Sequence, residues 1–163
     1  MGDTTGRWGF AEPGPLRDEL TALALAGTKT TTSSLALEFE IEGAELPAVG
    51  QRDLLVDSTD RPVAIVETVS VRVVRLADVD DRHAIDEGEG YADAAAFRTS
   101  HERYWTESGV VDQIRAHLGD PAWSITDDAL VVAERLRIVA RLGPDARVDE
   151  LSADGSLDVE SGE

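Results

Sequence analysis

The chain has 163 residues, 42% of them hydrophobic, which is enough for one domain with a hydrophobic core of its own. No apolar run approaches the roughly 18 residues of a membrane helix, and a chain without cysteine has no disulfide and no thiolate metal site. A formal net charge of −18 argues against sequence-independent binding of long nucleic acids, which depends on lysine and arginine. The N-terminus lacks the pattern of a secretion signal, so we expect a soluble cytoplasmic protein with no membrane partner.

The first predicted element is a helix that ends just before a cluster of hydroxyl side chains. Residues 15–27 combine Pro15 near the start, leucines at helical spacing and Gly27 at the end. The threonine-rich segment 30–34 favours an extended conformation. Lys29 is therefore predicted to lie in the turn between a helix and a strand.

The rest of the chain predicts a mixture of strands and helices. Residues 35–42 alternate as a strand does but also suit a short helix, and the pattern leaves both open. Residues 53–74 predict a β-hairpin, a short helix ends near Gly88, and Asp93 is placed to cap a longer helix. The last predicted elements are a helix at 110–118 and a strand at 129–142. This order predicts an α+β fold with a mixed sheet or an open barrel.

The C-terminal end differs from the rest in composition. Residues 145–163 contain seven acidic side chains and a single basic one, Arg147. A segment with low hydrophobicity and high charge buries too little apolar surface to offset the conformational entropy lost on folding. We therefore expect one domain over residues 1–142 and an acidic, flexible tail over residues 143–163.

Lys29 and Thr32 form the first candidate site. Lys29 is the only lysine among the fifteen lysine and arginine residues. A lysine in a turn can accept the proton of a nearby threonine hydroxyl, which is one way to activate a nucleophile. The alternative is a surface lysine beside a polar strand, and the spacing by itself favours that alternative.

Residues 83–105 contain the second candidate site. Two helices joined at a glycine-rich corner would bring together Glu87, Glu89, Arg98 and His101. Carboxylates beside an arginine and a histidine can transfer protons, although the same pattern is typical of a solvated network or a helix cap. The three histidines of the chain show no metal-ligand spacing, so we predict no metal and no cofactor.

Two further features concern the walls of a cleft. Glu134 alternates with apolar residues in the last strand, so its carboxylate either lines the cleft or pairs with an arginine. Phe97, Tyr104 and Trp105 share a helix face with the histidine at position 101, a pattern that suits a core face more often than a surface that stacks on bases.

Three stretches together resemble the ASCH domain family of the PUA-like superfamily. They are residues 23–35, 83–105 and 130–139, and the likeness extends over about residues 7–142, nearest to free-standing bacterial ASCH proteins. The resemblance implies a small β-barrel or mixed sheet flanked by helices. It also implies a cleft between the glycine-lysine-threonine turn and the helical segment. Members of the family are associated with RNA binding; some cleave RNA, and some hydrolyse N4-acylated cytidine.

The hydrolase members of the family have three catalytic residues, and the resemblance implies a counterpart of each in this chain. The lysine of the G-x-K turn corresponds to Lys29, the threonine three residues later to Thr32, and the glutamate after the histidine-alanine pair to Glu87. This chain departs from those members because it is longer and adds the EGEG corner and the FRTSHERYW helix.

Two classes of function follow from the resemblance. In a binding module, Lys29 and Arg98 would hold phosphate, and an aromatic ring, that of Tyr91, Tyr104 or Trp105, would stack on a base. In a hydrolase or ribonuclease, the three matched residues would act on an acylated nucleoside or RNA. The sequence leaves this choice and the oligomeric state open. The side chains expected to contact the ligand are Thr30, Ser33, Glu89, Arg98, His101, Tyr104 and Glu134.

Overall fold

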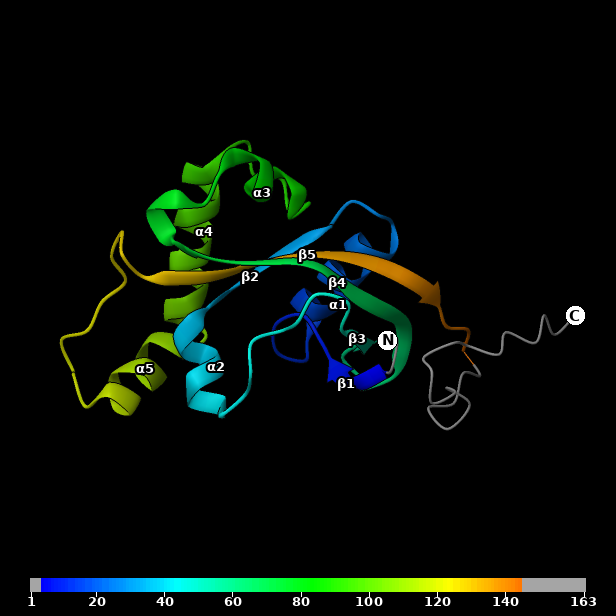
Figure 1. Ribbon diagram of the computed structural model, residues 1–163, viewed down its shortest axis with the longest axis horizontal. Coiled ribbons are helices and arrows are strands. Elements are labelled where there is room, and N and C mark those ends of the chain that lie inside the picture. Colours follow the sequence, from blue (N-terminus) through cyan, green and yellow to red (C-terminus); the bar gives the residue numbers. More distant parts are fainter. Residues whose placement is uncertain (1–3, 145–163) are drawn as a thin grey trace, which may run out of the picture. The chain divides into compact units, whose positions relative to one another are not determined.

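The computed structural model describes residues 4–144, and Figure 1 labels its helices and strands. Most of the predicted acidic tail, from residue 145 onward, lies outside the described residues. Within the described part of the chain, no helix has the length and apolar character needed to span a lipid bilayer.

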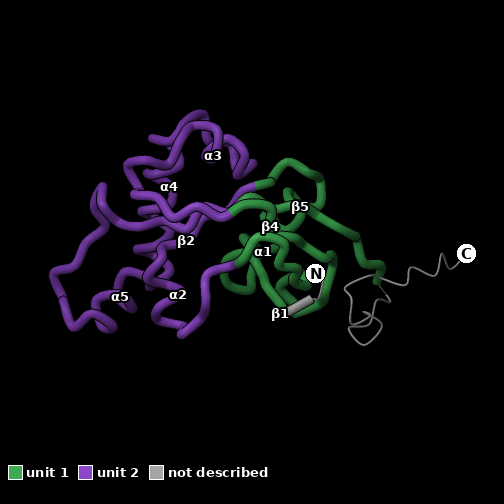
Figure 2. The backbone as a smooth tube through the Cα atoms, in the orientation of Figure 1, with its two compact units in different colours: residues 1–30, 48–70, 135–163 green, residues 31–47, 71–134 purple. Residues whose placement is uncertain are grey.

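The chain forms two compact units, coloured separately in Figure 2. Unit 1 takes in the chain up to residue 30, residues 48–70 and the chain from residue 135, whereas unit 2 takes in residues 31–47 and 71–134. Each unit has its own cluster of buried apolar side chains.

Unit 1 is built on strands with one helix. It contains β1 (Thr4–Trp8), α1 (Pro15–Leu25), β3 (Arg52–Val56), most of β4 (Pro62–Arg75) and the second half of β5 (Leu130–Arg141). β1 pairs with β3 in parallel, and β3 pairs with β4 in antiparallel orientation, as the predicted hairpin requires. The buried apolar side chains of this unit are Phe10, Leu20, Ala24, Leu55, Ala64, Val66 and Leu136.

Unit 2 is mainly helical. It contains β2 (Thr31–Leu35), α2 (Ala36–Glu42), the 3-10 helix η1 (Leu76–Asp78), α3 (Asp81–Asp86), α4 (Ala94–Glu107) and α5 (Val110–Leu118), with the remaining parts of β4 and β5. Asp93 caps α4 as predicted, because its side chain accepts a hydrogen bond from the backbone of Ala96. The buried apolar cluster comprises Leu35, Leu76, Val79, Ala84, Phe97, Trp105, Val111, Ile114 and Val131.

The strands form one mixed sheet in the order β1-β3-β4-β5-β2. The predicted α+β class is confirmed. Because β1 and β2 stand at the two ends of the strand order, the sheet is open, and the mixed-sheet description fits better than a closed barrel.

The structure settles one segment that the sequence pattern left open and adds a strand that the pattern did not predict. Residues 36–42 form α2, and Glu38 accepts a hydrogen bond from the backbone nitrogen of Leu35 at its start, which favours the helix over the strand. β1 was not predicted, because its sequence TTGRW has no alternation of apolar residues and its pairing partner β3 is more than forty positions away.

Candidate functional site

The end of helix α1 fixes the backbone of Lys29. Gly27 adopts a left-handed conformation, with φ of 80°, which a residue with a side chain rarely takes up. This turn allows the backbone nitrogens of Thr28 and Lys29 to donate to the carbonyl of Leu23, at 3.0 and 3.1 Å. Lys29 is thus held at a helix C-terminus, as its place in the sequence predicted.

The side chain of Lys29 lies over an aromatic ring. Its Nζ is 5.3 Å from the centroid of Phe10, within the range of a cation–π interaction. Phe10 in turn makes an edge contact with Trp8, with centroids 4.5 Å apart. Lys29 is only 5% exposed, so it is a buried residue of unit 1 and not the surface lysine of the alternative interpretation.

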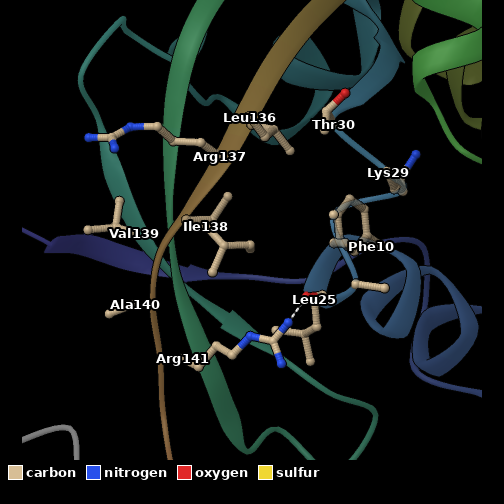
Figure 3. Close-up of a pocket in the computed structure, with 14 residues that line it drawn as sticks. Phe10, Leu25, Lys29, Thr30, Leu136, Arg137, Ile138, Val139, Ala140 and Arg141 are labelled. Atoms are coloured by element: carbon tan, nitrogen blue, oxygen red, sulfur yellow. Dashed lines mark hydrogen bonds between the residues drawn. The ribbon is translucent and has the colours of Figure 1, made fainter.

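Unit 1 contains a cavity of about 510 Å³ beside this lysine (Figure 3). Pockets of this size accept small ligands such as a nucleotide. Side chains of Phe10, Leu25 and Ile138 give the cavity an apolar character. The other lining residues are Ala24, Ala26, Gly27, Lys29, Thr30, Val66, Leu136, Arg137, Val139, Ala140 and Arg141.

Two arginines of β5 border the cavity and already have protein partners. Arg137 donates to Glu67 at 2.6 Å, and Arg52 donates to the same carboxylate at 3.0 Å. These hydrogen bonds lower the pKa of Glu67, with Arg137 the larger cause. Arg141 donates to the carbonyl of Leu25 at the end of α1, an interaction drawn as a dashed line in Figure 3. Figure 3 also shows Arg137 extending to the side of β5 away from Phe10.

In unit 2, His83 connects β2 to α3. Its ring nitrogen Nε2 lies 2.7 Å from the hydroxyl of Ser33, and its carbonyl accepts the hydroxyl of Thr31 at 2.8 Å. The side chain of Asp80 caps α3 by accepting the backbone nitrogen of His83. Because side chains alternate across a strand, the two residues of β2 that contact His83 share one face, and Thr32 points to the opposite face.

The glycine-rich corner follows α3 and orients its carboxylates. Gly88 and Gly90 both have positive φ, 72° and 92°, which explains the EGEG pattern in backbone terms. Glu87 caps the end of α3 and is fully buried, and its Oε2 lies 3.0 Å from Nε2 of His101 on α4. Glu89 is half-buried, and its carboxylate lies within 4.8 Å of both.

Burial and neighbouring carboxylates act on two groups around this cluster. Burial raises the pKa of Glu38, and the hydrogen bond from the backbone of Leu35 and, to a smaller extent, His101 partly offset that rise. Burial also raises the pKa of Tyr91 to about 12, and the carboxylates of Glu89 and Glu87 add to the effect. The phenol of Tyr91 is therefore neutral at physiological pH and donates to Ser100 at 2.9 Å.

The cluster meets the spacing requirement of a metal site, because Glu87, Glu89 and His101 each offer a ligand atom within 4.8 Å of the others. Two of these three atoms, Nε2 of His101 and Oε2 of Glu87, lie 3.0 Å apart.

Comparison with known proteins places this geometry in a family. The family model for the ASCH domain matches residues 6–140. The chain belongs to the ASCH domain family. A search of curated protein sequences finds no match.

Two crystal structures resemble this ASCH domain. A DUF984-family protein from Enterococcus faecalis V583 has 24% identity and a TM-score of 0.69, with 84% of this chain and 77% of that chain covered. An ASCH domain from Lactobacillus crispatus JV V101 has 23% identity and the same TM-score, with 84% and 80% covered. At this level of identity, the likeness concerns the fold.

Within the ASCH domain, the predicted site residues fall into two groups. Lys29 and Thr30 line the cavity of unit 1, and the Thr30 hydroxyl accepts a hydrogen bond from Arg135 at 3.4 Å. Glu87, Glu89 and His101 form the cluster of unit 2. A meeting of Lys29, Thr32 and Glu87 stays a prediction.

Other residues that were predicted to contact a ligand are paired with protein groups or packed in the core. Arg98 pairs with Glu102 at 2.9 Å and Asp127 at 2.5 Å, so its guanidinium is neutralised by carboxylates. Tyr104 is half-buried and packs against the core of unit 2. Trp105 is 1% exposed, so its ring has no face open to a base. Glu134 is 7% exposed on β5, as its position among apolar residues predicted.

Sequence reasoning missed part of the cavity of unit 1. Phe10 and Arg141 both line it, although they lie at opposite ends of the domain's sequence. Phe10 falls within residues 7–142, over which the family resemblance extends, but in none of the three stretches that carry it. No local pattern indicates that Arg141 reaches the end of α1, since that contact spans 116 positions.

Proposed function

We propose that this ASCH domain binds a nucleoside or a single RNA nucleotide in the cavity of unit 1. The observation that carries the proposal is the burial of Lys29 over Phe10 at the wall of a cavity of about 510 Å³. A cation beside an apolar pocket suits a ligand with a phosphate or carbonyl group and a planar apolar body. The association of the ASCH family with RNA supports the same ligand class.

The charges of the chain favour a short ligand over a long RNA. With a formal net charge of −18, the protein repels an extended phosphate backbone. Arg137, which lines the cavity, adds to this preference, because Glu67 neutralises part of its charge. A single nucleotide requires only one cationic contact, and Lys29 supplies it.

A hydrolase is the second candidate, and the identity of the buried cation favours it. Lysine can act as a base in its neutral form, whereas arginine stays protonated in proteins. In this mechanism, Lys29 takes the proton of Thr32, and the threonine oxygen attacks the amide carbonyl of an N4-acylated cytidine. The C–N bond breaks, Glu87 either orients the substrate or protonates the leaving amine, and water then hydrolyses the threonine ester.

Calorimetric titration with cytidine, N4-acetylcytidine and a short single-stranded RNA tests the proposal. We expect micromolar to millimolar binding of at least one of them, and a loss of at least tenfold in Lys29→Ala. Arg61→Ala is the matched control, because it removes one cation from an exposed position in the same unit and should leave the affinity unchanged. A protein that binds none of the three probes would contradict the proposal.

A further inference from the structure

Phe10, the aromatic wall of the cavity in unit 1, lies in a loop and not in a helix or strand. The loop runs from the end of β1 at Trp8 to the start of α1 at Pro15. The ring is nevertheless only 3% exposed, and it lies beside the side chain of Lys29 (Figure 3). Because a loop has no ladder of backbone hydrogen bonds, other contacts must hold this ring in place.

The guanidinium of Arg17 holds the backbone of this loop. Its Nε donates to the carbonyl of Phe10 at 3.0 Å, and its Nη2 donates to the carbonyl of Ala11 at 2.7 Å. Both bonds come from one planar group, so they fix the two carbonyls relative to each other. Arg17 belongs to the first turn of α1, and its side chain therefore ties the loop to that helix.

The backbone of Ala11 shows why the loop needs such a partner. Its φ is 53°, in the left-handed region that a residue with a Cβ rarely adopts. A strained conformation persists only where surrounding contacts determine it. The hydrogen bond from Arg17 to the carbonyl of Ala11 is a contact of this kind.

Gly9 leaves the space that the guanidinium occupies. A Cβ at position 9 would lie 2.6 Å from Cζ of Arg17 and 2.8 and 2.9 Å from its Nε and Nη1. These distances are shorter than the roughly 3.5 to 4.0 Å between carbon atoms in contact. A side chain at position 9 would therefore push the flexible arginine away from the two carbonyls. Gly9 and Arg17 thus belong to one contact.

We propose that Arg17 is a positioning residue of the cavity, which holds the Phe10 ring in the wall through the carbonyls of Phe10 and Ala11. Arg17 is not among the residues that line the cavity, so it acts through the ring and not by touching a ligand. A ring that is already fixed loses less conformational entropy when a planar nucleoside packs on it. The placement of the ring rests on contacts within unit 1, whereas its effect on a ligand rests on the proposed function.

The single lysine of the chain gives a direct readout of the ring position. With ¹³C-labelled lysine, nuclear magnetic resonance of the unliganded, full-length chain shows the side-chain signals of Lys29 alone. The ring current of Phe10 shields protons near its face, so we expect the Hε signal of Lys29 to lie upfield of its position in the urea-unfolded chain.

Two variants should move this signal and a third should not. In Arg17→Ala and in Gly9→Ala, we expect the Hε signal to return toward the unfolded position, because the ring is no longer fixed. Arg61→Ala, which removes an exposed arginine of the same unit, should leave it in place. An unchanged signal in Arg17→Ala would overturn the positioning role. If Arg17→Ala fails to fold by circular dichroism, Gly9→Ala, which keeps every hydrogen-bonding group, decides the question with the same readout.

Calorimetric titration with cytidine tests the effect on a ligand. Arg17→Ala and Gly9→Ala should each weaken cytidine binding about tenfold, or about 1.4 kcal/mol. The double variant should bind no more weakly than either single one, because both changes remove the same contact. Additive losses would contradict the shared contact, and parental affinity in a variant whose Lys29 signal has moved would contradict the effect on the ligand. If the parent itself does not bind cytidine, this ligand assignment fails, whereas the Lys29 signal still decides whether Arg17 positions the ring.

Discussion

Lys29 holds its Nζ 5.3 Å from the centre of the Phe10 ring, although nineteen positions separate the two residues. The contact joins the turn after α1 to the segment that precedes it. It places the only lysine of the chain at the wall of a cavity, where its chemistry can be tested by a single substitution.

Lys29→Arg separates binding from catalysis. Arginine keeps the positive charge and can supply hydrogen bonds, so ligand affinity should stay within about tenfold of the parent, or about 1.4 kcal/mol. Arginine does not act as a base, so hydrolysis of N4-acetylcytidine should be abolished if Lys29 has that role. Product formation by chromatography and affinity by calorimetry give the two readouts.

Thr32→Val is the companion variant, because it removes the hydroxyl with little change in shape. It should bind N4-acetylcytidine and not hydrolyse it. Hydrolysis at a near-parental rate in Lys29→Arg would rule out the general base.

A zero-length carbodiimide cross-link tests whether Lys29 and Glu87 meet. Because Lys29 is the only lysine, every cross-link from a lysine side chain to a carboxylate has one known end. Because Glu87 is fully buried, we expect peptide mass spectrometry to identify its half-buried neighbour Glu89 as the other end. Lys29→Arg is the control that must lose the cross-link. Exclusive linkage to carboxylates of unit 1, such as Glu67, would contradict the predicted triad.

Two adjacent serines of β2 offer a matched pair for the His83 contact. Ser33→Ala removes the 2.7 Å hydrogen bond to a histidine that is 3% exposed. The expected loss is about 1 to 3 kcal/mol in the free energy of unfolding. Ser34→Ala makes the same change on the opposite face of the strand and should stay within about 0.5 kcal/mol. Urea denaturation of the two variants checks the difference.

Glu67 gives the stability of the protein an acid dependence of known sign. Arg137 and Arg52 lower its pKa in the folded state, so the folded protein holds the carboxylate ionised at a pH where the unfolded chain has taken up the proton. The resulting stability is present above the ordinary glutamate pKa of about 4.3 and is lost as pH falls through the lowered value. Glu67→Gln should flatten this part of a urea-denaturation profile between about pH 5 and pH 2. An unchanged slope would contradict the assignment.

The acidic tail provides a test of the domain boundary. A protein that ends at residue 144 should melt within a few degrees of the full chain, because residues 145–163 carry little apolar surface to bury. Differential scanning calorimetry at equal protein concentration gives the comparison. A drop of more than about 8 °C would exceed the effect of a 1 kcal/mol change and would show that tail residues such as Leu151 contribute to the fold.

The sequence by itself determined the local structure at residues whose conformational preference is strong, such as those that begin, cap or end a helix. Pro15 and Gly27 bounded α1, Asp93 capped α4, and the second half of the predicted hairpin at 53–74 became part of β4. It also singled out Lys29, Glu87 and His101, because lone or clustered ionisable groups stand out in an apolar pattern. These features are local, and each depends on neighbours within a few positions.

Only the tertiary structure decided which of these residues interact. The segment 35–42 became a helix although its own pattern allowed a strand, and β1 formed on a sequence with no strand pattern because β3 offered it a backbone edge. The same holds for the site: Phe10 under Lys29, Arg141 at the end of α1, and the contact between the His101 ring and Glu87. Periodicity reports the environment of one element, whereas pairing, burial and the direction of a hydrogen bond depend on partners that the fold brings from distant parts of the chain.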